Sequence, residues 1–92
     1  MKEAILSVKY ICPGELSKER YVEIIDFEGR KFTGLFQDGH MKKDSELIVK
    51  ILEEKDDILL IQVPHGEHCG IYGHGLEAYG FITVKKENLK TA

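Results

Sequence analysis

The sequence predicts a single small all-β domain, and three observations support this fold class. The chain has 92 residues and a mass of 10.5 kDa, which allows one hydrophobic core and leaves little room for a second. β-Branched and aromatic residues gather in short runs, as is typical of strands. Nine glycines, two prolines and several aspartates separate these runs and predict turns between them.

The first predicted strand covers residues 3–11, where apolar and polar residues alternate imperfectly. Pro13 and Gly14 end this strand, because proline cannot donate to a ladder and glycine favours a turn. Residues 15–20 are mostly polar and predict either a loop or one helical turn capped by Ser17.

A tight hairpin is predicted next, between strands at residues 21–28 and 31–37. Gly29 lies at the turn, where a positive φ angle is expected. Gly34 interrupts the returning strand, which predicts a bulge or a sharp bend of the kind found at barrel corners.

Residues 45–55 fit both a helix and a strand. As a helix, they place Leu47 and Ile51 on one apolar stripe behind a serine cap; as a strand, the same two residues share a face. A polar tip at residues 54–57 and an apolar run at residues 58–63 follow. Two apolar runs around a short polar tip are typical of a hairpin, so a hairpin is favoured. A helix at residues 45–55, which would make an α+β domain, is the alternative.

Residues 64–80 differ from the rest of the chain because five glycines and a proline crowd them. We expect a long loop here, with an irregular edge strand at residues 70–73 and one turn at residues 76–79. Loops of this length are often functional. A last strand is predicted at residues 81–85, followed by an apolar plug at Leu89 and a fraying tail.

The order of these elements resembles that of small SH3-like barrels. A long first strand is followed by a loop, a tight hairpin, a second hairpin and a short last strand. The resemblance predicts one barrel of about five or six strands over residues 1–92, because a closed sheet hides its edges. An OB-like barrel is the alternative. Strand order carries no site residues, so the resemblance implies no function.

Charge and composition limit the partners and the compartment. Thirteen Lys and Arg against sixteen Asp and Glu give a net charge of −3 and an isoelectric point near 5.8. This balance argues against a general nucleic-acid binder and against docking on an anionic membrane. Glu3 and Lys9 interrupt the apolar segment that a secretory signal peptide would need. No uncharged apolar run is as long as a membrane span, which needs about 18 residues. We therefore expect a cytoplasmic protein whose Cys12 and Cys69 are reduced thiols, with no nucleic-acid or membrane partner.

One cluster of side chains offers candidate chemistry. Three of the four histidines and one of the two cysteines lie between positions 65 and 74. The cluster consists of His65, His68, Cys69 and His74. Imidazole and thiolate are natural ligands of zinc, so the cluster predicts a zinc site on a glycine-rich loop. The spacing matches no standard zinc module, and a solvated surface loop is the alternative interpretation. His40 lies outside the cluster in sequence.

Two functional hypotheses follow from these patterns. The first is a non-enzymatic protein-interaction or assembly module that acts through a strand edge or through residues 64–80, with self-association as one version. The second is a zinc-binding protein that uses the cluster at residues 65–74. An enzyme in which Cys69 is the nucleophile and a histidine the base is less favoured, because nothing in the sequence specifies a substrate or an oxyanion hole.

Overall fold

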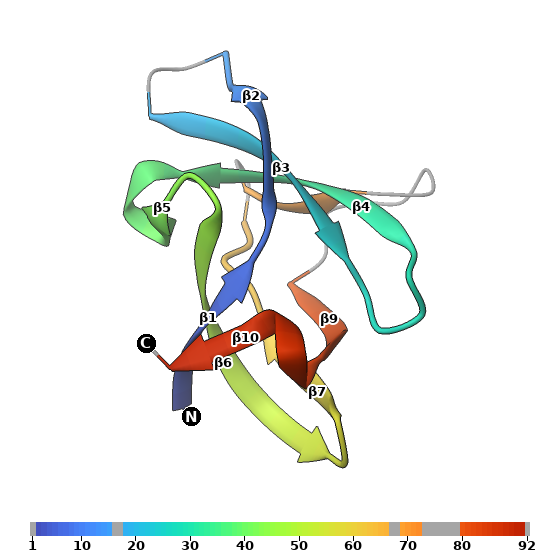
Figure 1. The fold of residues 1–92 in the computed structure, drawn as a ribbon. Helices are drawn as coiled ribbons and strands as arrows, with labels where there is room; N and C mark the ends of the chain where they lie inside the picture. Colours follow the sequence, from blue (N-terminus) through green and yellow to red (C-terminus); the bar gives the residue numbers. More distant parts are fainter. Residues whose placement is uncertain (1, 16–17, 67–68, 73–79, 92) are drawn as a thin grey trace.

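The computed structural model describes residues 2–15, 18–66, 69–72 and 80–91, which form two antiparallel β-sheets (Figure 1). The predicted all-β class is confirmed. The predicted barrel is wrong in two respects. The sheets do not close into a barrel, and the described residues form ten short strands in place of five or six.

Sheet A contains six strands. In spatial order these are β10 (Leu89–Thr91), β1 (Lys2–Ser7), β6 (Glu46–Lys55), β7 (Ile58–Gln62) and β9 (Phe81–Lys85), with β5 (Met41–Lys43) also paired to β6. Sheet B has the order β2 (Lys9–Pro13), β3 (Glu19–Ile25), β4 (Lys31–Gln37) and β8 (Gly70–Tyr72). Two short 3₁₀ helices, η1 (Asp38–His40) and η2 (Lys86–Asn88), follow β4 and β9 respectively.

The predicted first strand is divided into β1 and β2, which belong to different sheets. Val8 lies between them, is buried, and donates its N–H to the carbonyl oxygen of Ser45 at 3.0 Å. The chain therefore passes from sheet A to sheet B within one extended run, as the bend between β1 and β2 shows (Figure 1). This change of sheet explains the imperfect alternation of residues 3–11.

The hairpin of β3 and β4 is confirmed, and its turn depends on the buried carboxylate of Asp26. This carboxylate accepts the main-chain N–H groups of Glu28 at 3.0 Å and Arg30 at 2.8 Å, and the Nε–H of Arg30 at 2.7 Å. Burial alone would raise the pKa of Asp26, but these hydrogen bonds outweigh it and hold the pKa below its ordinary value. Next to it, Phe27 donates its N–H to the carbonyl oxygen of Thr83 in β9 at 2.9 Å, which joins the turn to sheet A.

Gly29 has the predicted positive φ angle, at 85°, whereas the bulge predicted at Gly34 is wrong. β3 and β4 pair in one continuous register along their whole length. Gly34 is required for space instead. A Cβ atom at this position would overlap Cε2 of Phe36, whose side chain is fully buried.

The predicted hairpin at residues 45–63 is confirmed, and the helical alternative is wrong. β6 and β7 pair from Lys50 opposite Gln62 to Lys55 opposite Ile58. Their register shifts between Ile51 and Glu53, so one extra residue bulges from β6.

The C-terminal third contains one confirmed edge strand and one correction. β8 forms within the predicted residues 70–73 and pairs with β4, and β9 has the predicted bounds 81–85. The expected fraying tail is wrong, because Leu89–Thr91 pair with β1 as β10 and Leu89 packs against the core. The turn predicted at residues 76–79 and the cap predicted at Ser17 lie outside the described residues.

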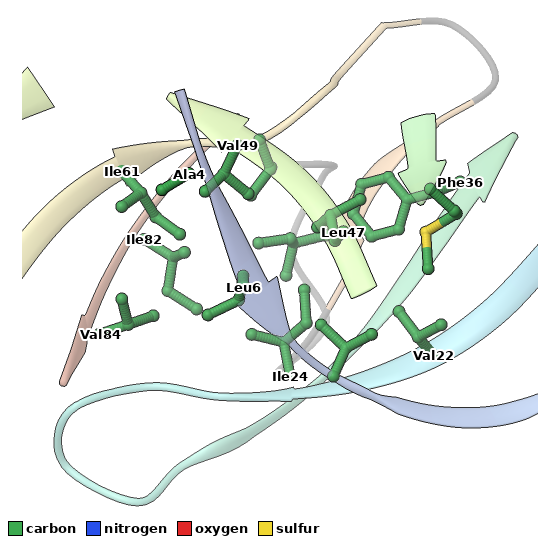
Figure 2. Packing of buried hydrophobic residues seen from close by; sticks show 14 of the residues in the cluster. Ala4, Leu6, Val22, Ile24, Phe36, Leu47, Val49, Ile61, Ile82 and Val84 are labelled. Atoms are coloured by element: carbon green, nitrogen blue, oxygen red, sulfur yellow. The ribbon is translucent and has the colours of Figure 1, made fainter. Parts of the chain in front are cut away.

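The hydrophobic core lies between the inner faces of the two sheets (Figure 2). Sheet A contributes Ala4, Leu6, Leu47, Val49, Ile61, Ile82 and Val84, and sheet B contributes Val22, Ile24 and Phe36. Because successive strand residues point to opposite faces, the residues between them in sequence define an outer face on each sheet. The described residues include no helix long and apolar enough to cross a membrane.

Candidate functional site: a cleft on the outer face of sheet A

The candidate site is a cleft at the place where β6 changes its neighbour. β5 pairs with β6 at Glu46 and Leu47, and β7 pairs with β6 from Lys50 onward. Ile48 and Val49 lie between these two partners and, within the described residues, pair only with β1 on the opposite edge. Main-chain groups of successive strand residues point to opposite edges, so one of these two residues directs its N–H and C=O toward the gap.

The gap is kept open by the paths of the two neighbouring segments. After Gln62 the chain leaves β6 but stays beside β9, because the Val63 N–H donates to the carbonyl oxygen of Gly80 at 2.9 Å. Pro64 follows and has no N–H with which to continue a ladder. A cleft of about 430 Å³ lies between these residues, η1 and the middle of β6, with Glu3 on its border. This volume is within the range of ligand-binding clefts.

His65 is the predicted site residue that lines the cleft. Its Nδ1 lies 3.3 Å from the carbonyl oxygen of Val63. A carbonyl oxygen only accepts hydrogen bonds, so Nδ1 carries a proton, and in the neutral form of the ring Nε2 is the acceptor. Gly80 makes this ring position accessible, because a Cβ atom there would lie 2.6 Å from Cγ of the His65 ring.

Cys69 lies opposite Gly66, the residue that follows His65, while His68 and His74 lie outside the described residues. Gly66 donates its N–H to the carbonyl oxygen of Cys69 at 2.9 Å and forms a bridge with it. Burial raises the pKa of the Cys69 thiol, which disfavours the thiolate that a zinc ligand or a nucleophile requires. In the part of the chain that the structure describes, no three His, Cys, Asp or Glu side chains group in a way that could hold a metal ion.

His40 lies outside the predicted cluster in sequence, but the fold brings it into the same cleft as His65. Its Nδ1 accepts the N–H of Gln37 at 3.2 Å, and its ring packs edge-on against Phe36. An accepting Nδ1 has no proton, so the neutral ring carries its proton on Nε2. Burial lowers the pKa of His40, which favours this neutral form. The cleft therefore has a hydrogen-bond donor at His40 and an acceptor at His65.

An exposed aromatic ring extends the cleft toward β9. Phe81 is the cross-strand neighbour of Gln62, and its ring centroid lies 5.9 Å from that of His65. Its exposed fraction is 52%, the highest among the large hydrophobic side chains that the structure describes. Phe81 and His65 thus form an aromatic rim beside the cleft.

Comparison with protein-family models, curated proteins and solved structures gives no match to this chain.

The sequence patterns identified His65 but did not place it in one site with His40, with Lys50, which also lines the cleft, or with Phe81. The signal for Phe81 was present, since it alternates with the core residue Ile82 in the predicted strand 81–85 and must therefore face outward. No local signal was available for His40, because its position depends on the long-range pairing of β5 with β6.

Proposed function

We propose that this chain is a non-enzymatic protein-interaction module that binds its partner over the cleft and the adjacent rim of Phe81 and His65. The observation that carries the proposal is the exposure of Phe81, at 52%, opposite Gln62, the residue of β7 at which the pairing with β6 ends. Exposed aromatic side chains next to a cleft are typical anchors of protein partners. Because Cys12 and Cys69 are both free thiols, we further propose that the module acts in the cytosol.

The edge strands β2, β8, β9 and β10 are poor sites for pairing with a partner strand, which supports this choice of surface. β2 is exposed along its length, but it has a register shift next to Ile11 and a proline at its end, two features that hinder edge pairing. β8 and β10 have three residues each, which is short for strand addition. In the edge strand β9, the carbonyl oxygen of Thr83 already accepts the N–H of Phe27. Partner binding at the cleft is therefore favoured over simple edge-to-edge addition.

The proposal is tested by site-specific photo-crosslinking in cells. A photoreactive phenylalanine analogue replaces Phe81 in one variant and Tyr10, an exposed aromatic of β2, in a matched control. We expect discrete adducts, with a protein partner or with a second copy of the chain, from position 81 and not from position 10. No adduct at position 81, or the same adducts from both positions, would contradict the proposal.

Zinc binding by His65, His68, Cys69 and His74 is the second candidate function, and the state of His65 favours it. With its Nδ1 proton donated to the Val63 carbonyl, the ring has Nε2 ready to bind a metal, an arrangement common among zinc-bound histidines. The raised pKa of the Cys69 thiol opposes it, because the metal must displace that proton.

A thermal-shift experiment with zinc separates the two candidates. Zinc in modest excess should raise the melting temperature of the wild type, because binding to the folded state alone stabilises it. Cys69→Ser should abolish the increase, whereas Cys12→Ser, at the exposed cysteine of β2, should retain it. Equal shifts in both variants, or none in the wild type, would exclude the zinc site.

A further inference from the structure

The outer face of sheet A is basic, although the whole chain has a net charge of −3. Strand register and alternation place five lysines and three glutamates on this face, and a sixth lysine, Lys42, lies next to them at the register shift of β5. The lysines are Lys42, Lys43, Lys50, Lys55, Lys85 and Lys90, and the glutamates are Glu3, Glu46 and Glu53. The corresponding face of sheet B has equal numbers of each sign, at Lys9, Lys31, Glu19 and Glu23. The positive charge is therefore concentrated on the sheet that holds the cleft.

Much of this charge is not neutralised within the protein. Glu46 forms an ion pair with Lys90 across β1, and the nearby charges of Lys43 and Lys42 help to hold the pKa of Glu46 low. Within the described residues, no ion pair joins Lys42, Lys43 or Lys50 to a carboxylate. Lys42 and Lys43 lie on β5, which flanks the gap, and Lys50 lines the cleft itself. An acidic ligand would thus meet Lys50 in the cleft, and Lys42 and Lys43 along β5 next to it.

We infer that the partner presents an acidic, extended peptide segment with an apolar side chain. Its carboxylates would lie against Lys42, Lys43 and Lys50, and its apolar side chain against the rim of Phe81 and His65. Its main chain would meet the one N–H and C=O pair that Ile48 or Val49 directs toward the gap between β5 and β7. This inference rests on the proposed interaction function and specifies the chemistry of the partner.

A peptide is favoured over a nucleic acid by the same distribution of charge. Glu3 borders the cleft and Glu53 lies farther along β6. A phosphate backbone carries a charge at every nucleotide and would meet these carboxylates, whereas a peptide can place an uncharged side chain beside each of them. Among the described residues, the outer face of sheet A has one exposed aromatic ring, that of Phe81, whereas proteins that bind single strands use several as stacking platforms. Single-stranded DNA therefore enters the test as a competing ligand.

The experiment measures binding of three probes to the full chain by fluorescence polarisation and by NMR chemical shifts at low salt. The first probe is an acetylated peptide of the order Glu-Asp-Val-Glu-Leu-Glu-Asp-Glu, the second has lysine at every acidic position, and the third is an oligothymidylate. We expect saturable binding of the acidic peptide only, with shifts centred on Ile48, Val49 and Phe81. Added salt should weaken this binding, since its charge contacts are exposed.

Two variants test the surface. Lys42→Glu combined with Lys43→Glu should lower the affinity for the acidic peptide by about tenfold, since reversing two exposed charges changes the binding free energy by about 1–2 kcal/mol. Lys9→Glu, on the outer face of sheet B, changes net charge in the same direction and should leave the affinity within about twofold. Equal weakening by both variants, shifts confined to sheet B, or tighter binding of the lysine peptide or the oligothymidylate would overturn the inference. If position 81 captures a protein in cells while the acidic peptide does not bind, the interaction module stands and the acidic partner is rejected.

Discussion

Replacing Gly34 with alanine tests why a glycine lies inside β4. A Cβ atom there would overlap Cε2 of Phe36 and lie 3.1 Å from Cζ and 3.3 Å from Cδ2. Phe36 is fully buried, so its ring has to move into occupied core. The φ angle of Gly34 is not positive, so no backbone strain contributes. Overpacking of this kind costs about 1–3 kcal/mol, and alanine recovers about 0.5–1 kcal/mol of backbone entropy, so we expect the free energy of unfolding to fall by about 0.5–2 kcal/mol.

Urea denaturation followed by circular dichroism measures this loss. Gly39→Ala is the matched control, because its Cβ atom would meet nothing within 4 Å. This variant should be as stable as the wild type or more stable by up to about 1 kcal/mol, through the same recovery of backbone entropy. The combination of Gly34→Ala with Phe36→Leu isolates the contact, since a smaller side chain at position 36 relieves the overlap. The double variant should be more stable than the sum of the single losses predicts. Wild-type stability of Gly34→Ala, or strict additivity with Phe36→Leu, would refute the steric explanation.

Three further predictions concern other residues of the fold and the site. Asp26→Asn should lower the free energy of unfolding by about 1–3 kcal/mol at pH 7 through loss of charged hydrogen bonds, as urea denaturation would reveal. The pKa of Asp26 is lowered in the folded protein, so its contribution to the free energy of unfolding is complete above the unfolded pKa of about 4. This contribution is lost as the pH falls through the folded pKa. In acid, the wild type should therefore lose more stability than Asp26→Asn. Gly80→Ala should displace the His65 ring and change its imidazole ¹⁵N shifts from those of an Nδ1-protonated ring, and unchanged shifts would contradict the packing at Gly80. In thiol labelling near neutral pH, exposed Cys12 should react faster than Cys69, whose burial raises its pKa, and the reverse order would be inconsistent with the structure.

Local sequence patterns predicted the parts of the fold that depend on local chemistry. Gly29 marked the turn between β3 and β4, and the polar tip after residue 53 marked the hairpin of β6 and β7. The division of residues 3–11 at Val8 was not predictable in the same way. Its cause is a hydrogen bond from Val8 to Ser45 and the pairing of two sheets, both of which depend on residues far away in sequence. The same limit explains β10, which forms only because β1 offers it a free edge.

The candidate site shows a similar division between local and long-range information. The cluster at residues 65–74 was visible as a concentration of metal-binding residue types, and one of its members, His65, lines the cleft. The pattern could not show that burial raises the pKa of the Cys69 thiol, nor that His40 shares the cleft. Residue type identifies what a side chain is able to bind, whereas hydrogen bonds such as that of Gln37 to His40 decide which atoms remain available.

The cleft itself follows from the lengths of three strands. β6 has ten residues, whereas β5 and β7, which share one of its edges, have three and five residues and pair with opposite ends of it. Ile48 and Val49 are left between them, and their side chains point in opposite directions, with Val49 buried in the core. A partner segment at this gap would therefore contact main chain and the outward-facing Ile48 without disturbing a core side chain or breaking an existing ladder. At the edge strands, a partner would instead meet the proline of β2, which has no N–H to donate, or would have to displace the hydrogen bond from Phe27 on β9. The gap in β6 thus offers a partner one main-chain N–H and C=O beside the outward-facing Ile48, without the ladder that addition of a whole strand would need.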